Sequence, residues 1–168
     1  MTTIVVKDGK MAADSRLTVS SDAGGDRIFS VKKIFRLGNG CLVGASGENG
    51  PGLIFVRWAD QNLDADGFPN ECADPRPPEI ETGDEDDDLF ILVLTPSGDL
   101  VQYDSYWVPE AIDLKSNYGF YAIGSGAKAA MGALHADEKM GARQAVIIAS
   151  LVDPWTAGPF VEMIPGVE

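Results

Sequence analysis

The sequence predicts an α+β fold in which antiparallel strands and a group of helices form separate layers. Two observations support this fold class. Short apolar segments joined by glycine-containing turns recur as hairpins, and two helical segments, the first of them alanine-rich, follow one another near the carboxyl end. The chain has 168 residues, of which 45% are hydrophobic. This size and composition suit one globular unit, so we expect a single domain over 1–168.

The first half of the chain contains two of these hairpins. Residues 2–6 are rich in β-branched side chains, an Asp8-Gly9 turn follows, and residues 11–15 return. Residues 28–37 and 41–45 form a second apolar pair around the turn at 38–40. The apolar spacing over 53–63 then predicts a helix.

The second half contains the third hairpin and the remaining helices. Residues 89–94 and 100–106 flank a Pro-Ser-Gly turn, and 120–123 form a short strand. Two helices are expected over 127–134 and 141–151, the second ending before Pro154. Residues 160–164 are predicted to form a closing strand.

The net charge of −13 is concentrated in one segment. Residues 64–88 contain eleven of the 26 acidic residues and one base, Arg76, which gives this segment a charge of −10. A surface of this sign disfavours nucleic acid as a partner. The segment also contains four prolines, so we interpret it as a solvated loop. A cation site in residues 84–88 is the alternative, but these acids lack the spacing of an EF-hand.

Cysteine, histidine and hydropathy patterns exclude several classes of protein. Cys41 lies in an apolar run and is expected to be a reduced core residue, whereas Cys72 lies in the polar segment. His135 is the single histidine and is expected on an exposed helix face, so neither a His-rich metal site nor a Ser-His triad is expected. We predict no metal site and no cofactor. The sequence has neither a membrane-spanning apolar run nor a signal-like start. We therefore expect a cytoplasmic protein without a membrane partner.

The start of the chain offers a nucleophile. If Met1 is removed, Thr2 has both a hydroxyl group and a free α-amine. The hydroxyl oxygen can attack a carbonyl carbon while the amine of the same residue accepts the proton. Threonine is small enough for ordinary methionine removal. An N-terminal threonine alone is a weak signal, because many proteins start with Met-Thr.

Six segments, in order along nearly the whole chain, resemble proteasome β-type and HslV-type peptidases of the N-terminal nucleophile hydrolases. They are Thr2-Thr3-Ile4-Val5, Ala12-Ala13-Asp14-Ser15-Arg16, Val31-Lys32-Lys33-Ile34-Phe35, Gly44-Ala45-Ser46-Gly47, Tyr121-Ala122-Ile123-Gly124-Ser125-Gly126 and Asp153-Pro154-Trp155-Thr156-Ala157-Gly158. The resemblance implies a four-layer αββα sandwich with antiparallel sheets. The acidic segment stands where this family has much of its second central helix, so that helix is expected to be shortened or replaced by an acidic loop.

The resemblance also implies a catalytic set. Thr2 would attack the peptide carbonyl, and Lys33 would stabilise the developing alkoxide. Asp14 would pair with Lys33 and keep it charged, and the N–H of Gly47 would donate to the oxyanion. Without the resemblance, Lys33 would be interpreted as an exposed strand residue and Asp14 as the start of a turn.

Three further residues, Ser125, Asp153 and Thr156, would hold and orient the α-amine. Thr156 stands where the family motif has serine. On their own, Ser125 would be interpreted as a helix cap and Asp153 as part of a helix stop. By resemblance, the substrate side chain would be bound by Leu17, Thr18, Val31, Phe35, Ala45, Asn49 and Leu53.

The resemblance thus implies a threonine endopeptidase that acts on peptides or unfolded proteins inside a ring-shaped homo-oligomer. The resemblance also implies an ATPase unfoldase as a partner, although the acidic segment puts its docking in question. Two alternatives stay open. One is a catalytically silent structural or assembly protein that retains the fold, and the other is an amidase that acts on a small amide.

Overall fold

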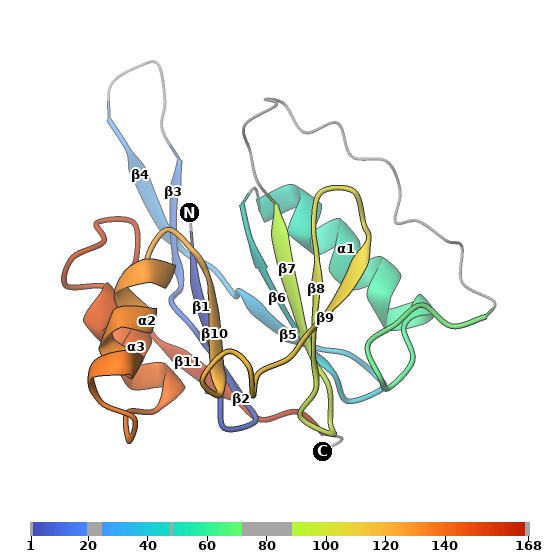
Figure 1. Ribbon diagram of the computed structural model, residues 1–168. Coiled ribbons are helices and arrows are strands. Elements are labelled where there is room, and N and C mark those ends of the chain that lie inside the picture. The colour runs from blue at the N-terminus through green and yellow to red at the C-terminus, as the bar shows by residue number, and fades with distance from the viewer. Residues whose placement is uncertain (1, 20–24, 48, 72–88, 167–168) are drawn as a thin grey trace.

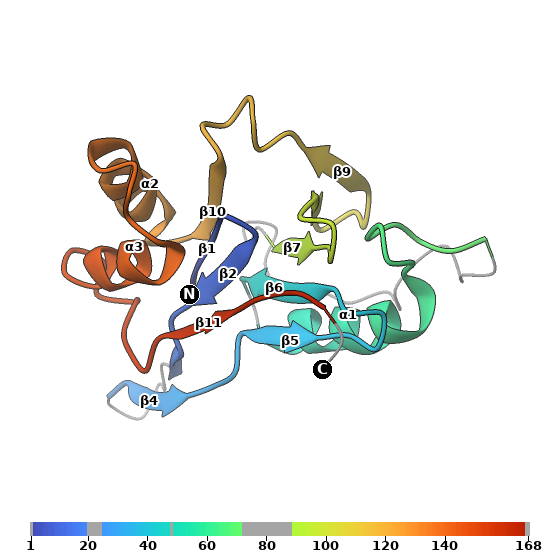
Figure 2. The ribbon, with the colours of Figure 1, turned by 90° about the horizontal axis from the view of Figure 1, so that it is seen from below.

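The computed structural model describes residues 2–19, 25–47, 49–71 and 89–166, and places them in four layers. Helix α1 (Asn49–Asn62) forms one outer layer, and helices α2 (Ala127–Ala136) and α3 (Ala142–Ala149) form the other (Figure 1). Two antiparallel sheets lie between them. The view from below shows the same separation of α1 from the α2–α3 pair (Figure 2). The predicted αββα sandwich is therefore the observed fold.

The sheet beneath α2 and α3 contains the N-terminal hairpin. Strands β1 (Thr3–Lys7) and β2 (Lys10–Ala13) pair at its centre. Strand β10 (Phe120–Gly124) pairs with β1, and β11 (Val161–Met163) pairs with β2. The order β10-β1-β2-β11 brings the start of the chain beside the Gly124-Ser125-Gly126 segment.

The second sheet packs against α1. Its order is β5-β6-β7-β8-β9, with bounds Ile34–Arg36, Leu42–Ser46, Phe90–Leu94, Leu100–Tyr103 and Pro109–Ile112. All neighbours are antiparallel and joined by short turns, except for the long connection between β6 and β7 that contains α1. Strand β9 lies on the sheet edge and starts at Pro109; an edge strand and the first residue of a strand are both positions where sheets tolerate proline.

Alternation along the strands divides the buried side chains among three interfaces. In β1, Ile4 and Val6 point into the interface between the two sheets, whereas Val5 points toward α2 and α3. In β7, Leu92 faces the other sheet, and Val93 packs with the α1 side. Because both faces of these strands are buried, they are continuously apolar instead of alternating between apolar and polar residues. Successive side chains still point to opposite faces.

The prediction of one strand over 28–37 was wrong. Strand β4 (Arg27–Ser30) pairs with β3 (Arg16–Val19) in a separate two-stranded sheet, and β5 pairs with β6. Residues 31–33 connect the two sheets, so the apolar pattern continues although the pairing partner changes. The other predicted hairpins and helices are present, with ends that differ by a few residues, whereas β3 and β9 were not predicted. The predicted acidic loop over 64–88 and the environment of Cys72 lie largely outside the described residues.

Two predictions about single residues are confirmed. The side chain of Cys41 is fully buried in the core between α1 and its sheet. Burial is the main cause that raises the pKa of the Cys41 thiol to about 11, so the thiol is protonated at neutral pH. His135 is exposed on α2, where its ring packs edge-on against Tyr118 and Phe120.

Candidate active site

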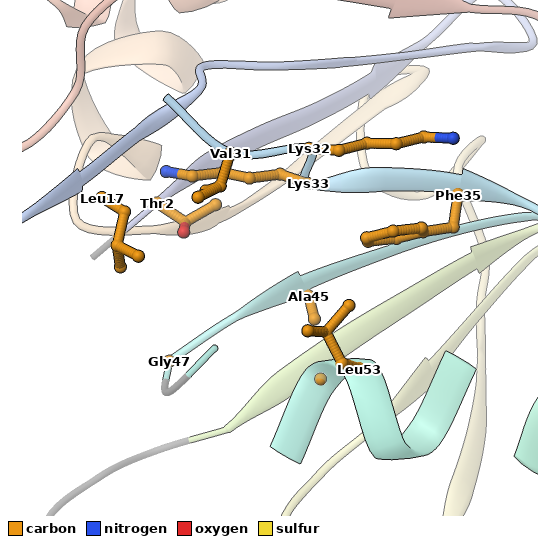
Figure 3. Close-up of a pocket in the computed structure, with 10 residues that line it drawn as sticks. Thr2, Leu17, Val31, Lys32, Lys33, Phe35, Ala45, Gly47 and Leu53 are labelled. Atoms are coloured by element: carbon orange, nitrogen blue, oxygen red, sulfur yellow. The ribbon is translucent and has the colours of Figure 1, made fainter. Parts of the chain in front are cut away.

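A pocket lies at the end of the sandwich where the chain begins. Its walls come from β3, the 31–33 connection, β5, the end of β6 and the first turns of α1 (Figure 3). Most of the walls are apolar, and Thr2 and Lys33 are among the polar exceptions. The lining residues are Thr2, Leu17, Val31, Lys32, Lys33, Phe35, Ala45, Gly47, Gly52 and Leu53.

Lys32 and Lys33 point in opposite directions from their shared segment. The ammonium end of Lys33 extends toward Thr2, whereas that of Lys32 extends away from it, over Phe35 (Figure 3). The Lys32 nitrogen lies 5.2 Å from the centre of the Phe35 ring, a cation–π distance. Lys33 is 7% exposed and Thr2 is 5% exposed. Lys33 is therefore buried next to the threonine, and the alternative of an ordinary exposed strand lysine is excluded.

Lys33 forms a buried ion pair with Asp14. Its nitrogen lies 2.9 and 3.0 Å from the two carboxylate oxygens. Asp14 is 1% exposed and also accepts hydrogen bonds from the main-chain N–H groups of Thr3 and Arg16. Burial lowers the pKa of Lys33, and the attraction of Asp14, together with that of Asp153, only partly opposes this effect. The pair therefore holds a positive charge with a reduced proton affinity beside Thr2.

Gly47 ends the β6 side of the pocket. Its φ angle of +110° lies in a region that residues with a side chain rarely adopt. This conformation turns the main chain from β6 toward α1 at the mouth of the pocket. Glycine is thus required at this position by the main-chain conformation, independently of the oxyanion role expected for its N–H.

A second group of polar side chains surrounds Asp153. Ser125 donates a hydrogen bond to Oδ2 of Asp153 at 2.7 Å, and Thr156 donates to the same oxygen at 2.5 Å. The N–H of Trp155 donates to Oδ1 at 3.2 Å. Burial alone would raise the pKa of Asp153, but these hydrogen bonds outweigh it and hold the pKa below its ordinary value.

Two glycines bring the N-terminal strand close to this group. A Cβ at Gly124 would overlap the carbonyl oxygen of Thr2, and φ at Gly124 is +95°. A Cβ at Gly126 would overlap the hydroxyl oxygen of Thr3. The N–H of Ser125 donates to the Thr2 carbonyl at 2.9 Å. The Gly-Ser-Gly motif therefore allows a close approach of main chains that fixes the position of Thr2.

The two adjacent threonines have different environments. Thr2 lines the pocket, whereas Thr3 is fully buried and points away from it, as alternation along β1 requires. The hydroxyl of Thr3 accepts a hydrogen bond from the Gly126 N–H at 3.1 Å and lies 2.5 Å from the Thr156 hydroxyl. Of the two hydroxyl groups, only that of Thr2 is placed to meet a substrate.

The structure brings together most, but not all, of the predicted site residues. Thr18 is not in the pocket lining, because Leu17 next to it faces the pocket; Thr18 accepts a hydrogen bond from Arg16 instead. The side chain of Asn49 lies outside the described residues. Five of the seven predicted substrate contacts line the pocket: Leu17, Val31, Phe35, Ala45 and Leu53.

Three residues of the site were not predicted, namely Lys32, Gly52 and Thr3. The first two line the pocket. No sequence pattern singles out Gly52. Glycine is needed at this position because a Cβ there would lie 2.7 Å from the Cβ of Ala45. Thr3 could have been found from its place beside Thr2 in a strand, where the alternate residue faces the opposite side.

Within the described part of the chain, no group of three or more His, Cys, Asp or Glu side chains is placed to hold a metal ion. No helix among the described residues is both long enough and apolar enough to span a bilayer.

Comparison with known proteins gives fold-level matches only. No protein-family model matches the chain, and no curated protein sequence matches it. Among solved structures, Thiobacillus denitrificans BPH in complex with epoxomicin is 19% identical, with a TM-score of 0.63 and coverage of 96% of both chains. A second structure of this BPH has a TM-score of 0.60, with 19% identity and coverage of 96% of this chain and 95% of that one.

Eukaryotic HslV from Trypanosoma brucei is similar to the same extent. It is 17% identical, has a TM-score of 0.63, and the match covers 96% of this chain and 97% of that chain. The matches span nearly the whole of each protein, so the likeness extends to all four layers and is not confined to one hairpin. The chain therefore has the fold of HslV-type and proteasome-like peptidases.

Proposed function

We propose that the chain is a threonine peptidase that cleaves peptide bonds with Thr2 after removal of Met1. The observation that carries this proposal is the position of Thr2 in an apolar pocket beside Lys33, which is ion-paired with the buried Asp14. The arrangement supplies a hydroxyl group, a nearby positive charge and a cavity for a side chain. The fold shared with HslV supports the same function.

The proposed reaction has two stages. The Thr2 hydroxyl oxygen attacks the substrate carbonyl carbon, and its proton passes to the Thr2 α-amine. The negative charge on the carbonyl oxygen is stabilised by the N–H of Gly47. The C–N bond then breaks, and the leaving amine takes the proton. Water, activated by the same α-amine, hydrolyses the resulting ester and regenerates Thr2.

The residues around Thr2 have two roles in this reaction. Lys33 lowers the cost of negative charge on the Thr2 oxygen, and Asp14 holds Lys33 in place. Ser125, Asp153 and Thr156 orient the α-amine and favour its protonated form when it has accepted the proton. The low pKa of Asp153 supports this role, because an ionised carboxylate is needed at neutral pH.

The test combines intact mass with a covalent probe. The purified protein should lack the mass of Met1, and an epoxyketone should add once per chain. Epoxomicin is a suitable probe, since the structure of Thiobacillus denitrificans BPH holds it. Removal of Met1 without probe addition and without peptide hydrolysis would instead favour the catalytically silent protein. Hydrolysis of small amides but not of peptides would favour the amidase.

The pocket predicts a preference for apolar side chains. Its walls are formed largely by Leu17, Val31, Phe35 and Leu53, so a charged side chain would lose hydration there. Neither lysine of the lining would compensate an acidic side chain, because Lys33 is paired with Asp14 and Lys32 extends away from Thr2. Peptides with Leu, Phe or Tyr before the cut should be cleaved best in a positional peptide library. A library that selected Asp or Arg there would contradict this pocket.

A matched pair of variants tests the same prediction. Leu17→Ala should lower kcat/KM for Leu substrates by about tenfold, as expected for the loss of one large apolar contact. Ile28→Ala is the control, because Ile28 lies on the paired strand, is 60% exposed and is not in the pocket lining. Equal losses in the two variants would show that the effect arises from the hairpin as a whole.

The assembly is proposed to be a homo-oligomeric ring with Thr2 facing an inner chamber. A chamber would confine proteolysis to peptides and unfolded proteins, and an ATPase unfoldase would deliver them. The apolar helices α1 and α2 are the expected contact surfaces. The segment 64–88 should not form the contacts, because its charge of −10 would repel its own copies.

Light scattering on two proteins tests the ring. The intact chain should have a mass that is a multiple of 17.9 kDa, and deletion of residues 79–87 should leave the number of subunits unchanged. A monomer at working concentration would refute the ring. Dissociation after the deletion would refute only the exclusion of the acidic segment from the contacts.

A further inference from the structure

A continuous line of hydrogen bonds runs through Thr3 behind the pocket. The N–H of Gly126 donates to the Thr3 hydroxyl at 3.1 Å, and this hydroxyl lies 2.5 Å from that of Thr156. Thr156 in turn bonds Oδ2 of Asp153 at 2.5 Å. Thr3 and Thr156 are 0% and 2% exposed, so water does not substitute for these partners.

The direction of every proton in this line is determined by its two ends. A main-chain N–H can only donate, so the Thr3 oxygen accepts from Gly126. An ionised carboxylate can only accept, so Thr156 uses its single proton on Asp153. Thr156 therefore accepts in the bond with Thr3, and Thr3 is its donor. A donor of this kind polarises the next hydroxyl group and strengthens its bond to the carboxylate.

Thr3 also bonds the other carboxylate of the site. Its main-chain N–H donates to Oδ1 of Asp14 at 2.9 Å, the oxygen that also binds Lys33 at 2.9 Å. Thr3 thus bonds Asp14 through its main chain and is linked to Asp153 through the hydroxyl of Thr156. Since Thr3 is fully buried and does not line the pocket, it does not touch a substrate.

We propose that Thr3 is a positioning residue whose hydroxyl group orients Thr156 and, through it, keeps Asp153 ionised and aimed at the amine of Thr2. The expected effect on kcat rests on the proposed peptidase function, whereas the expected effect on the pKa of Asp153 does not. The Thr3 hydroxyl acts on catalysis through its bond to Thr156 and not by contact with the reacting atoms.

Several groups act on the charge of Asp153, and only one of them depends on Thr3. Ser125, between β10 and α2, and the Trp155 N–H bond the carboxylate directly. Among the described residues, Lys33 is a charged group that interacts with it electrostatically. Loss of the Thr3 hydroxyl would weaken the Thr156 bond and leave the others, so the pKa of Asp153 would rise toward its ordinary value without reaching it.

The test compares Thr3→Val with Thr3→Ser in the full chain lacking Met1. Valine keeps the shape of threonine but has no hydroxyl group, whereas serine keeps the hydroxyl. Thr3→Val should lower kcat by about tenfold to a hundredfold, the scale of a misaligned catalytic group, while KM changes by less than about twofold because substrate contacts are intact. Thr3→Ser should retain most of the activity.

Thr95→Val is the control for loss of a buried threonine hydroxyl elsewhere. Thr95 is 0% exposed, and its hydroxyl accepts from the Asp99 N–H and bonds Ser97 in the β7–β8 turn. This variant should lose stability but keep kcat. A Thr3→Val protein with wild-type kcat, or a Thr3→Ser protein as impaired as Thr3→Val, would overturn the proposal.

A second readout does not depend on activity. In protein labelled with carbon-13 aspartate, the carboxyl signal absent from Asp153→Asn identifies Asp153, and its titration gives the pKa. The pKa should rise in Thr3→Val, and should remain at its wild-type value in Thr3→Ser and Thr95→Val. An unchanged pKa in Thr3→Val would overturn the role of Thr3 even in an active enzyme. A wild-type protein without activity would refute the peptidase, while this titration would still decide the role of Thr3.

Discussion

Thr2→Ala should reduce peptide hydrolysis by about 10⁴-fold or more, the order seen when the nucleophile of another hydrolase is removed. Alanine keeps the α-amine but has no oxygen to attack the carbonyl carbon. The melting temperature should change little, because the hydroxyl of Thr2 faces the pocket and the main-chain bond to Ser125 is kept. Initial rates on a fluorogenic peptide with Leu before the cut measure the effect.

Thr2→Ser is the matched variant. Serine supplies a hydroxyl group and a free α-amine at the same position, so this protein should remain measurably active and should react with an epoxyketone. A chain that retains Met1 should be inactive although every side chain is present, because the Thr2 nitrogen is then an amide without basicity. Full activity in Thr2→Ala, or in a protein shown by mass to retain Met1, would refute Thr2 as the nucleophile.

Much of the fold could be predicted from the sequence where pairing is local. The hairpins around Gly9, residues 38–40 and Gly98 are joined by short turns with glycine, and their apolar strands are continuous. The prediction failed at 28–37, where one uninterrupted pattern serves two sheets. A local pattern records burial and side-chain alternation but not the partner strand, so a change of sheet without a turn leaves no signal.

The site could be predicted only through the order of its motifs. Lys33 follows another lysine, and no local pattern shows that Lys33 turns inward to Asp14 while Lys32 extends over Phe35. Asp14 and Asp153 are 139 positions apart in the sequence. Asp14 follows β2 and Asp153 precedes β11, and the pairing of β2 with β11 brings the two segments together. Thr3 was missed because its role depends on contacts with Gly126 and Thr156 that exist only in the folded chain.

Lys33→Met should abolish activity and also destabilise the protein. Methionine has a similar length but no charge, so the alkoxide on Thr2 loses its stabilising cation. The carboxylate of Asp14 is left in a buried position without its counter-ion. Breaking one partner of a buried pair costs about 3–5 kcal/mol of unfolding free energy. Urea unfolding followed by fluorescence measures this loss.

The double variant Asp14→Asn/Lys33→Met separates the two effects. With both charges removed, no unpaired charge is buried, so part of the lost stability should return. Activity should not return, because the cation beside Thr2 is still missing. Recovery of activity together with stability would show that Lys33 serves only the fold.

The pH dependence of stability gives an independent check on Lys33. Burial lowers its pKa in the folded protein below the ordinary value of 10.5. Between the folded-state pKa and 10.5, the unfolded chain binds more protons at this group than the folded one does. The Lys33 contribution to the unfolding free energy therefore increases as the pH rises through that window, and it is smallest below it. Lys33→Met should lack this increase, so the difference in unfolding free energy between wild type and variant should grow toward alkaline pH.

The activity of the wild type should fall at a pH below 10.5, because Lys33 loses its proton there. A difference in unfolding free energy that stays constant through the alkaline range would show that the pKa of Lys33 is not lowered.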